Sequence, residues 1–283
     1  MDQKNKSKLI DGALVYMFCL LTTGLCCLLL LDHIGAFAVI LSAVIDIAVV
    51  VAATKISRIK TSAIFRYKKS AVRASVASAL VYGAAILVAL PMVLFGELLV
   101  PSFAAASFRL SNYMTLSELW QLPIMLFAVA YAYALLFDGY LYTRARSIGK
   151  DTLAILLTAL VAGVFRLDLY LMLPIAILEA ATATARKWTD SLTMPTALQF
   201  FTAAFALGLT EIASHFETTA AAEMGAAQVC GLSLICIAAA ISTVFASLGI
   251  KGDLKKMSAR IKLCLLIAAI VTLAVGCAIA GAE

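Results

Sequence analysis

The sequence predicts an all-α integral membrane protein, a bundle of about nine transmembrane helices, and three observations support this fold class. The chain is 64% hydrophobic, and its mean hydropathy of +1.03 lies far outside the range of soluble globular proteins. The apolar residues form continuous stretches, most of them near the roughly 20 residues that a helix needs to cross a bilayer. Finally, the basic residues lie between these stretches on alternate loops, which is typical of topology signals.

The predicted helices follow one another with short polar loops between them. Each stretch must be helical because hydrocarbon offers no partner for unpaired backbone N–H and C=O groups. The runs also lack the strict alternation of a transmembrane barrel. The fifth and sixth are shorter than a full span, so we expect them to be tilted or broken. In chain order the stretches are 12–31, 36–54, 75–100, 117–141, 152–165, 169–185, 194–213, 221–249 and 263–281.

The loop charges predict an orientation. When alternate loops are assigned to one side, all Lys and Arg residues except Arg109 and Arg166 fall on that side. Basic loops stay in the cytoplasm, so we expect a cytoplasmic N-terminus in an inner or plasma membrane. After nine spans the C-terminus, at Glu283, lies on the outer side. The net charge of +6 belongs to these loops, so the expected partner is the lipid bilayer with its anionic headgroups and not nucleic acid.

A short internal repeat predicts two structural units. The segment Lys68-Lys69-Ser-Ala-Val-Arg73 recurs as Lys255-Lys256-Met-Ser-Ala-Arg260. An even number of predicted spans separates the copies, so they have the same orientation, as parallel repeats do. We therefore predict a six-span first lobe over residues 1–187 and a partial, three-span second lobe over residues 188–283.

Polar residues inside the spans are the candidates for function, because a charge at the bilayer centre costs on the order of 3 kcal/mol. Asp46 and Glu179 lie well inside their stretches, and the alternative for Asp46 is a structural carboxyl bonded to a neighbouring helix. Asp138 lies about one turn from the inner end of its stretch, where it is expected to pair with Arg144 or reach the interface. The predicted ion- and substrate-binding residues are Asp46, Glu179, Asp138, Glu211 and Gln199.

Enzyme signatures are absent from the sequence. There is no His-Glu-x-x-His and no Gly-x-Ser-x-Gly. Asp138-Gly139 starts like the alcohol phosphatidyltransferase signature, but Tyr142 and Thr143 stand where that signature needs Ala-Arg. The seven cysteines all lie in apolar stretches and are interpreted as packing residues, not as disulfides or metal ligands. We therefore expect no enzyme, no catalytic residue, no metal and no cofactor, with an unrecognised membrane enzyme as the alternative.

Short motifs spread over nearly the whole chain resemble those of the multidrug and toxic compound extrusion (MATE) transporters and of their lipid-linked oligosaccharide flippase relatives. That family has two six-helix lobes around one central cavity, so three helices are missing here, and so are its acidic residues in helices one and seven. The resembling motifs are Tyr113-Met-Thr-Leu, Leu122-Pro123, Gly139-Tyr140, Gly149-Lys150-Asp151-Thr152, Met194-Pro195-Thr-Ala-Leu-Gln199-Phe200-Phe201, the run 220–225, and Gly252-Asp253-Leu-Lys255-Lys256.

The resemblance implies a transporter. It would export small organic cations or amphiphilic compounds in exchange for H⁺ or Na⁺. A lobe and a half leaves the cavity open, so a second copy or another membrane subunit is expected to close it. Two alternatives remain open: a non-transporting MATE-like scaffold or partner subunit, which the missing acids favour, and a relative of the flippases, which the lack of Lys and Arg at membrane depth disfavours.

Overall fold

The computed structural model describes residues 3–68, 70–99, 119–166, 169–216 and 226–281, and its regular elements in these ranges are all helical. Each of the nine predicted stretches falls on a helix within these ranges, so the predicted all-α fold class is confirmed. The elements are α1 (Gln3–Ile34), α2 (Ala36–Ile56), α3 (Thr61–Ile64), α4 (Val72–Leu99), α6 (Gln121–Tyr133), the π-helix η3 (Ala134–Leu141), α7 (Tyr142–Arg146), α8 (Asp151–Phe165), α9 (Leu169–Thr189), α10 (Thr193–Phe216), α11 (Ala226–Lys251), the 3₁₀ turn η4 (Asp253–Lys256) and α12 (Ala259–Ala280).

The chain is a multi-pass membrane protein. Among the described residues, six helical segments are long and apolar enough to cross a bilayer: Ser7–Ile34, Ala36–Ile56, Val72–Val93, Gln121–Arg146, Ala227–Lys251 and Ala259–Ala280. The outer helices present large apolar side chains, such as Leu28 at 81% exposure and Leu266 at 52%, and these face lipid in a membrane. Helix α8 has 15 residues. Its length of about 22 Å falls short of the hydrocarbon core of about 30 Å, as the short fifth stretch predicts.

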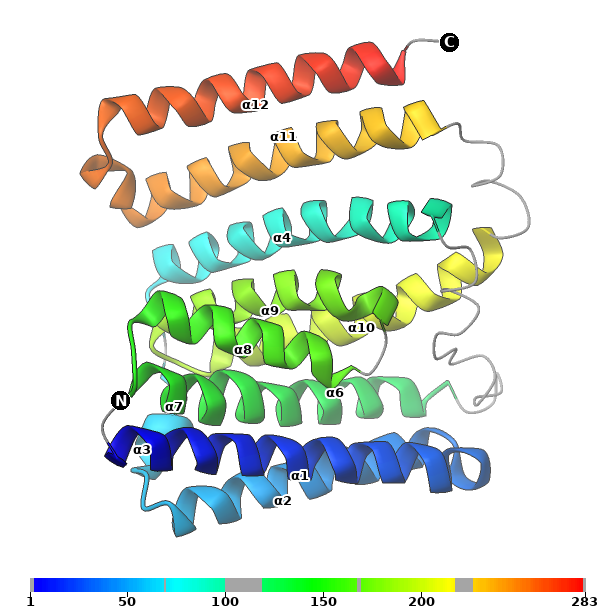
Figure 1. The fold of residues 1–283 in the computed structure, drawn as a ribbon, viewed down its shortest axis with the longest axis vertical. Helices are drawn as coiled ribbons and strands as arrows, with labels where there is room; N and C mark the ends of the chain where they lie inside the picture. The colour runs from blue at the N-terminus through cyan, green and yellow to red at the C-terminus, as the bar shows by residue number, and fades with distance from the viewer. Residues whose placement is uncertain (1–2, 69, 100–118, 167–168, 217–225, 282–283) are drawn as a thin grey trace.

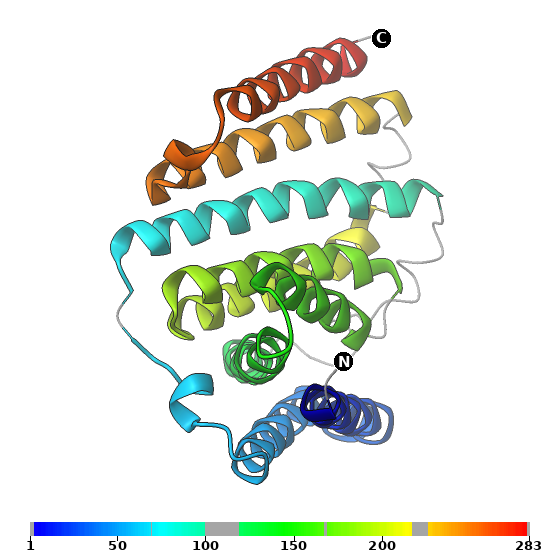
Figure 2. The ribbon, with the colours of Figure 1, turned by 60° about the vertical axis from the view of Figure 1, so that its left-hand side comes forward.

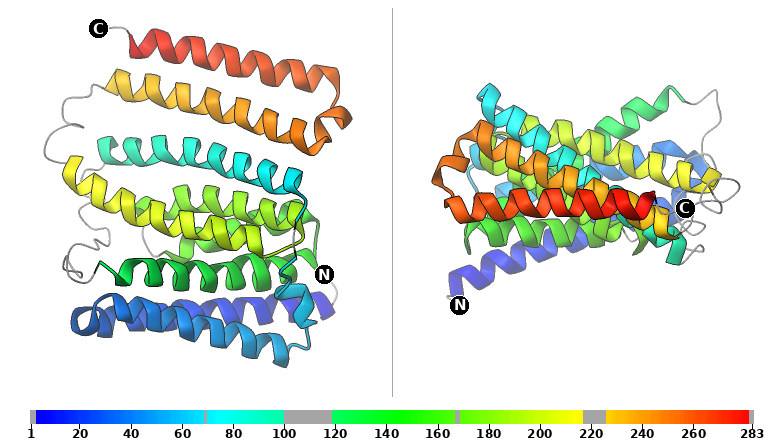
Figure 3. Two further views of the ribbon diagram at one scale, coloured as in Figure 1. Left: turned by 180° about the vertical axis from the view of Figure 1, so that it is seen from behind. Right: turned by 90° about the horizontal axis from the view of Figure 1, so that it is seen from above.

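The helices are stacked in a slab. Figure 1 shows α12, α11 and α4 as successive layers, then the group α8, α9 and α10, then α6, and finally the α1–α2 hairpin. Helix α4 packs against both α9 and α11, while α12 packs on α11. Figure 2 shows the same order from another side. The views from behind and from above in Figure 3 show the long helices running roughly side by side.

The basic segments predicted to share one side do meet at one end of the bundle, the left end in Figure 1. Arg144 bonds to Asp11 at 3.0 Å, which ties the start of α1 to α7. Asp151 binds both Arg146 and Lys187, at 2.8 and 3.4 Å, which ties α8 to the end of α9. The end of α11 joins the same end of the bundle through a cation–π contact between Lys251 and Trp188. The cytoplasmic assignment of this end and the division into two lobes stay predictions.

One helix changes its winding in the core. Helix α6 continues without a break into the π-helix η3, and η3 continues into α7. A π-helix has i→i+5 hydrogen bonds, is rare, and frequently marks functional sites. Residues 134–140 are all buried, and η3 contacts α2, α3, α8, α9 and α10. The π segment therefore holds its side chains, Asp138 among them, at the centre of the bundle.

Candidate active site

Three helices bring a cluster of polar side chains together inside the bundle. Asp138 comes from η3, Glu179 and Thr182 come from α9, and Gln199 comes from α10. Each of the four residues is at most 1% exposed. A buried group of two carboxyls with an amide and a hydroxyl is costly in an apolar bundle unless its members hydrogen-bond to one another.

The amide of Gln199 joins the two carboxyl groups. Its Nε2 donates to Glu179 Oε2 at 2.6 Å and to Asp138 Oδ2 at 3.2 Å. The Thr182 hydroxyl lies 3.2 Å from Asp138 Oδ1 and 2.9 Å from the backbone carbonyl of Glu179, and both are acceptors for its single hydrogen. Asp138 is thus contacted at both oxygens, whereas Glu179 is contacted at one.

Two acceptor atoms of the cluster are left over. Within the described part of the chain, Glu179 Oε1 and Gln199 Oε1 are buried and have no hydrogen-bond partner. An unpartnered buried acceptor costs roughly 1–3 kcal/mol and usually has a functional or solvent explanation. A carboxylate oxygen and an amide oxygen on adjacent residues of one cluster can both accept from the same small donor, such as a water molecule.

Three predicted site residues, Asp138, Glu179 and Gln199, are therefore neighbours. The expected partner of Asp138 is wrong: Arg144 bonds to Asp11 instead, and lies over the Tyr140 ring. The winding of η3 explains the difference, because it turns Asp138 inward to α9 and α10 and away from the interface.

The other two predicted residues lie elsewhere. Asp46 accepts hydrogen bonds from Thr22 at 3.1 Å and Thr23 at 3.0 Å, within the α1–α2 hairpin. Glu211 falls in α10, but its side chain lies outside the described residues. In the described part of the chain, no group of three or more His, Cys, Asp or Glu residues could hold a metal ion.

Thr182 and Arg186, which were not predicted from the sequence, lie on the same face of α9 as Glu179. Their spacings, three and seven residues after Glu179, are those of neighbours along one helix face. Arg186 is 5% exposed, and its Nη2 donates to the carbonyl of Ala63 in α3 at 2.7 Å. That spacing could have revealed both residues.

The fold and the cluster define a class: a multi-pass helical membrane protein with a buried pair of carboxyls joined by an amide. A protein-family model matches residues 115–205 of this chain, and it describes the type II CAAX prenyl endopeptidase Rce1-like family. The match covers less than half of the chain, from just before α6 into α10. No curated protein matches the chain. No solved structure matches it either.

The family match corrects the functional predictions. The matched family is a different membrane family from the MATE transporters, so the recognition, the export of organic cations and the scaffold and flippase alternatives are wrong. The matched family is a family of endopeptidases, which are enzymes, so the expectation of no enzyme is wrong as well. The misleading motifs are short groups of Pro, Gly and basic residues, which end helices and anchor loops in many multi-pass proteins.

Proposed function

We propose that this chain is a membrane-embedded endopeptidase that hydrolyses a peptide bond near the C-terminus of a prenylated protein. The observation that carries the proposal is a coincidence of position. The family match over residues 115–205 contains all four members of the buried cluster, Asp138, Glu179, Thr182 and Gln199. The part of the chain that resembles an endopeptidase is therefore the part that builds the polar centre of the bundle.

The cluster has the groups that amide hydrolysis needs. A water molecule that donates one hydrogen to Glu179 Oε1 and the other to Gln199 Oε1 would use both unpartnered acceptors. Glu179 then takes the proton as the water oxygen attacks the peptide carbonyl, and returns it to the leaving nitrogen as the C–N bond breaks. The products are a new carboxyl and a new amine. A positioned proton carrier of this kind contributes about 10²–10⁴-fold to a rate.

Asp138 and Gln199 have a different part in this mechanism. Gln199 Nε2 bonds to both carboxyls, and Thr182 contacts the second oxygen of Asp138. Asp138 is thus held by contacts at both of its carboxyl oxygens, while Glu179 keeps one oxygen free for the reacting water. Two carboxyls whose surroundings differ can have different roles, and here Glu179 carries the proton in both steps while Asp138 holds the Gln199 amide.

The substrate class follows from the family description and from the membrane. A CAAX sequence is a C-terminal Cys-a-a-X motif whose Cys is prenylated, so the substrate carries its own lipid and arrives within the bilayer. We also propose the predicted orientation, with the N-terminus and the basic end of the bundle in the cytoplasm, in an inner or plasma membrane. We likewise propose that the chain associates with a second copy or with another membrane subunit.

A peptidase assay tests the function. The purified protein in lipid nanodiscs is mixed with a farnesylated CAAX peptide that carries a fluorophore and a quencher on the two sides of the scissile bond. We expect cleavage by the wild type, and a loss of at least about 100-fold in Glu179→Gln and in Asp138→Asn. Asp46→Asn is the matched control, because it removes a buried carboxylate outside the matched region.

The control variant should retain cleavage to within about threefold. Absence of cleavage by a well-folded wild-type protein would overturn the proposed function. Full activity of Glu179→Gln and Asp138→Asn, with cleavage intact in the wild type, would move the active site away from this cluster.

A further inference from the structure

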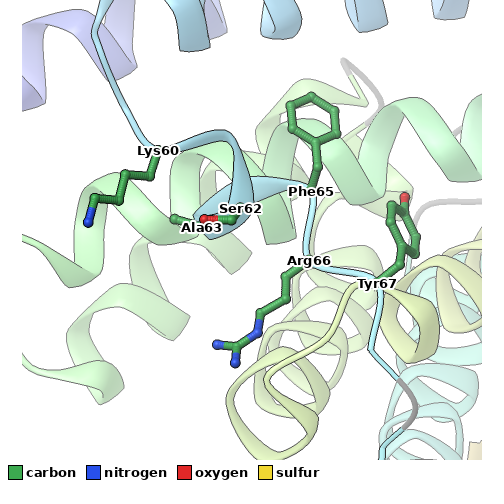
Figure 4. Close-up of a pocket in the computed structure, with 6 residues that line it drawn as sticks. All are labelled: Lys60, Ser62, Ala63, Phe65, Arg66 and Tyr67. Carbon is green, nitrogen blue, oxygen red and sulfur yellow. The ribbon is translucent and has the colours of Figure 1, made fainter.

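A cavity lies at the basic end of the bundle, beside the short helix α3. It has a volume of about 560 Å³, within the range of small-ligand pockets. Its lining residues all come from the segment 60–67 and comprise two cations, two small residues and two aromatic residues. Figure 4 shows Lys60 and Arg66 extending from separate points along this segment, with Phe65 directed away from both. The lining residues are Lys60, Ser62, Ala63, Phe65, Arg66 and Tyr67.

The cavity has more positive than negative charge. In the described residues, Lys60 has no carboxylate partner. Arg66 pairs with Asp190 but is 45% exposed, so its remaining N–H groups are accessible. Arg186 adds a third cation. It is nearly buried, bonds to Ala63 through Nη2, and its buried Nη1 has no partner in the described part of the chain. Three cations beside one carboxylate favour an anionic ligand.

The segment that lines the cavity is held in place by the turn between α9 and α10. The backbone N–H of Leu192 donates to the Arg66 carbonyl at 2.7 Å, and the backbone N–H of Lys68 donates to Ser191 Oγ at 3.0 Å. The cations at this end therefore have a fixed relation to α9 and α10, the helices that carry Glu179 and Gln199. A preorganised site of this kind loses little free energy to ordering when it binds a ligand.

The cavity is joined to the carboxyl cluster through Ile64 and through helix α9. Ile64, the last residue of α3, is fully buried, and its side chain is so close to Gly139 that an added Cβ there would lie 3.1 Å from Ile64 Cγ2. Gly139 follows Asp138 directly. Along α9, Arg186 lies four residues beyond Thr182, an axial rise of about 6 Å. Arg186, which bonds to the lining residue Ala63, is thus about one to two helical turns from the cluster.

We propose that this cavity binds the free C-terminal carboxylate of the peptide substrate, with Arg66 and Arg186 as its direct cationic partners and Lys60 as a further positive charge at its edge. The inference rests on the proposed function. Three extended residues span about 10 Å, which is the reach from the scissile bond of a Cys-a-a-X end to its terminal carboxylate. A carboxylate held at Arg186 and Arg66 therefore places the bond after the Cys at Glu179. The rings of Phe65 and Tyr67 provide apolar surface for the residues between.

The test compares two peptides that differ only in the terminal group, a free carboxylate or an amide. Each is a fluorescent farnesyl peptide with an N-methylated, uncleavable scissile bond, and its binding to the full chain in phosphatidylcholine nanodiscs is measured by anisotropy. The proposal predicts that the wild type binds the free acid at least about tenfold tighter than the amide. This preference should fall below about threefold in the Lys60→Gln/Arg66→Gln double variant. Lys55→Gln, an exposed cation of the same basic segment outside the cavity, should keep it.

The outcomes separate this inference from the proposed function. If cleavable peptides stay intact but the free acid still binds preferentially through Lys60 and Arg66, the pocket stands and the peptidase function fails. If both peptides are cleaved and bound alike, the function stands and the pocket assignment is overturned. If binding follows added phosphatidylglycerol and ignores the terminal group, the cavity holds lipid headgroups, which also overturns the assignment.

Discussion

Gln199 donates from one nitrogen to both carboxyl groups, so its replacement by Leu gives the most informative stability prediction. The substitution keeps a similar volume and removes the Nε2 donor to Glu179, at 2.6 Å, and to Asp138, at 3.2 Å. Both acceptors are buried and cannot turn to water. The free energy of unfolding should therefore fall, and it should fall by less when one carboxyl is removed first.

The magnitude follows from the two bonds. Hydrogen bonds to charged groups contribute about 1.5–3 kcal/mol each in soluble proteins, whereas those between membrane helices average about 0.6 kcal/mol. We therefore expect Gln199→Leu to lower the free energy of unfolding by about 2–4 kcal/mol. In a Glu179→Met background one of the two bonds is already gone, so the same substitution should cost about half as much. The coupling free energy between the two positions is then about 1–2 kcal/mol.

The free energy of unfolding is measured by reversible unfolding in mixed dodecyl maltoside and SDS micelles, followed by tryptophan fluorescence. The measurement is made on the wild type, on Gln199→Leu, on Glu179→Met and on the double variant, which together form a double-mutant cycle. Phe201→Leu is the control on the same helix, because Phe201 is 58% exposed and faces outward. It should change the free energy of unfolding by less than about 0.5 kcal/mol. Strictly additive effects of Gln199→Leu and Glu179→Met would show that the amide does not join the carboxyls, and would refute the site geometry.

Three further predictions concern the rest of the bundle. Gly163→Ala should lower the free energy of unfolding by about 1–3 kcal/mol in the same assay, because the new Cβ would overlap the Met172 carbonyl of α9. Gly83→Ala, which has open space around its Cβ, should raise it by about 0.5–1 kcal/mol. Hydrogen bonds from Lys251 and Lys256 lower the pKa of Asp253 below its ordinary value of 3.8. Because the folded-state pKa is lowered, ionised Asp253 stabilises the fold at pH values above its unfolded-state pKa. This stabilisation is lost as the pH falls through the folded-state pKa. Amide exchange over 251–256 should therefore differ between wild type and Asp253→Asn at pH 7, and converge well below pH 4; a difference that persists in acid would contradict the ion pair.

The fold class was predictable because membrane helices leave strong signals. Hydrocarbon forces every span to satisfy its backbone internally, so continuous apolar length identifies helices. The loop charges likewise identify one end of the bundle, where Asp151 and Trp188 now explain how those loops are held together. The same physics does not distinguish families, since a transporter and a protease obey identical rules for spanning a bilayer.

The candidate site was predictable only in part. Asp138, Glu179 and Gln199 stand out as polar residues inside apolar stretches, but no pattern in the sequence predicts that they are neighbours. Their meeting depends on the π winding of η3, and the apolar stretch that forms it has no sequence signature. The cavity beside α3 was hidden for a related reason. Its cations lie in a loop whose positive charge also serves topology, so Lys60 and Arg66 cannot be told from their neighbours.

The most direct test of the account is the source of the oxygen atom in the product. The purified protein in nanodiscs is incubated with a farnesylated CAAX peptide in H₂¹⁸O, and the masses of the fragments are measured by mass spectrometry. We expect one ¹⁸O in the new carboxyl of the prenylated fragment, with no such product from Glu179→Gln and full labelling with Asp46→Asn. An intact peptide after prolonged incubation with folded protein would contradict the claim that this chain is a membrane peptidase.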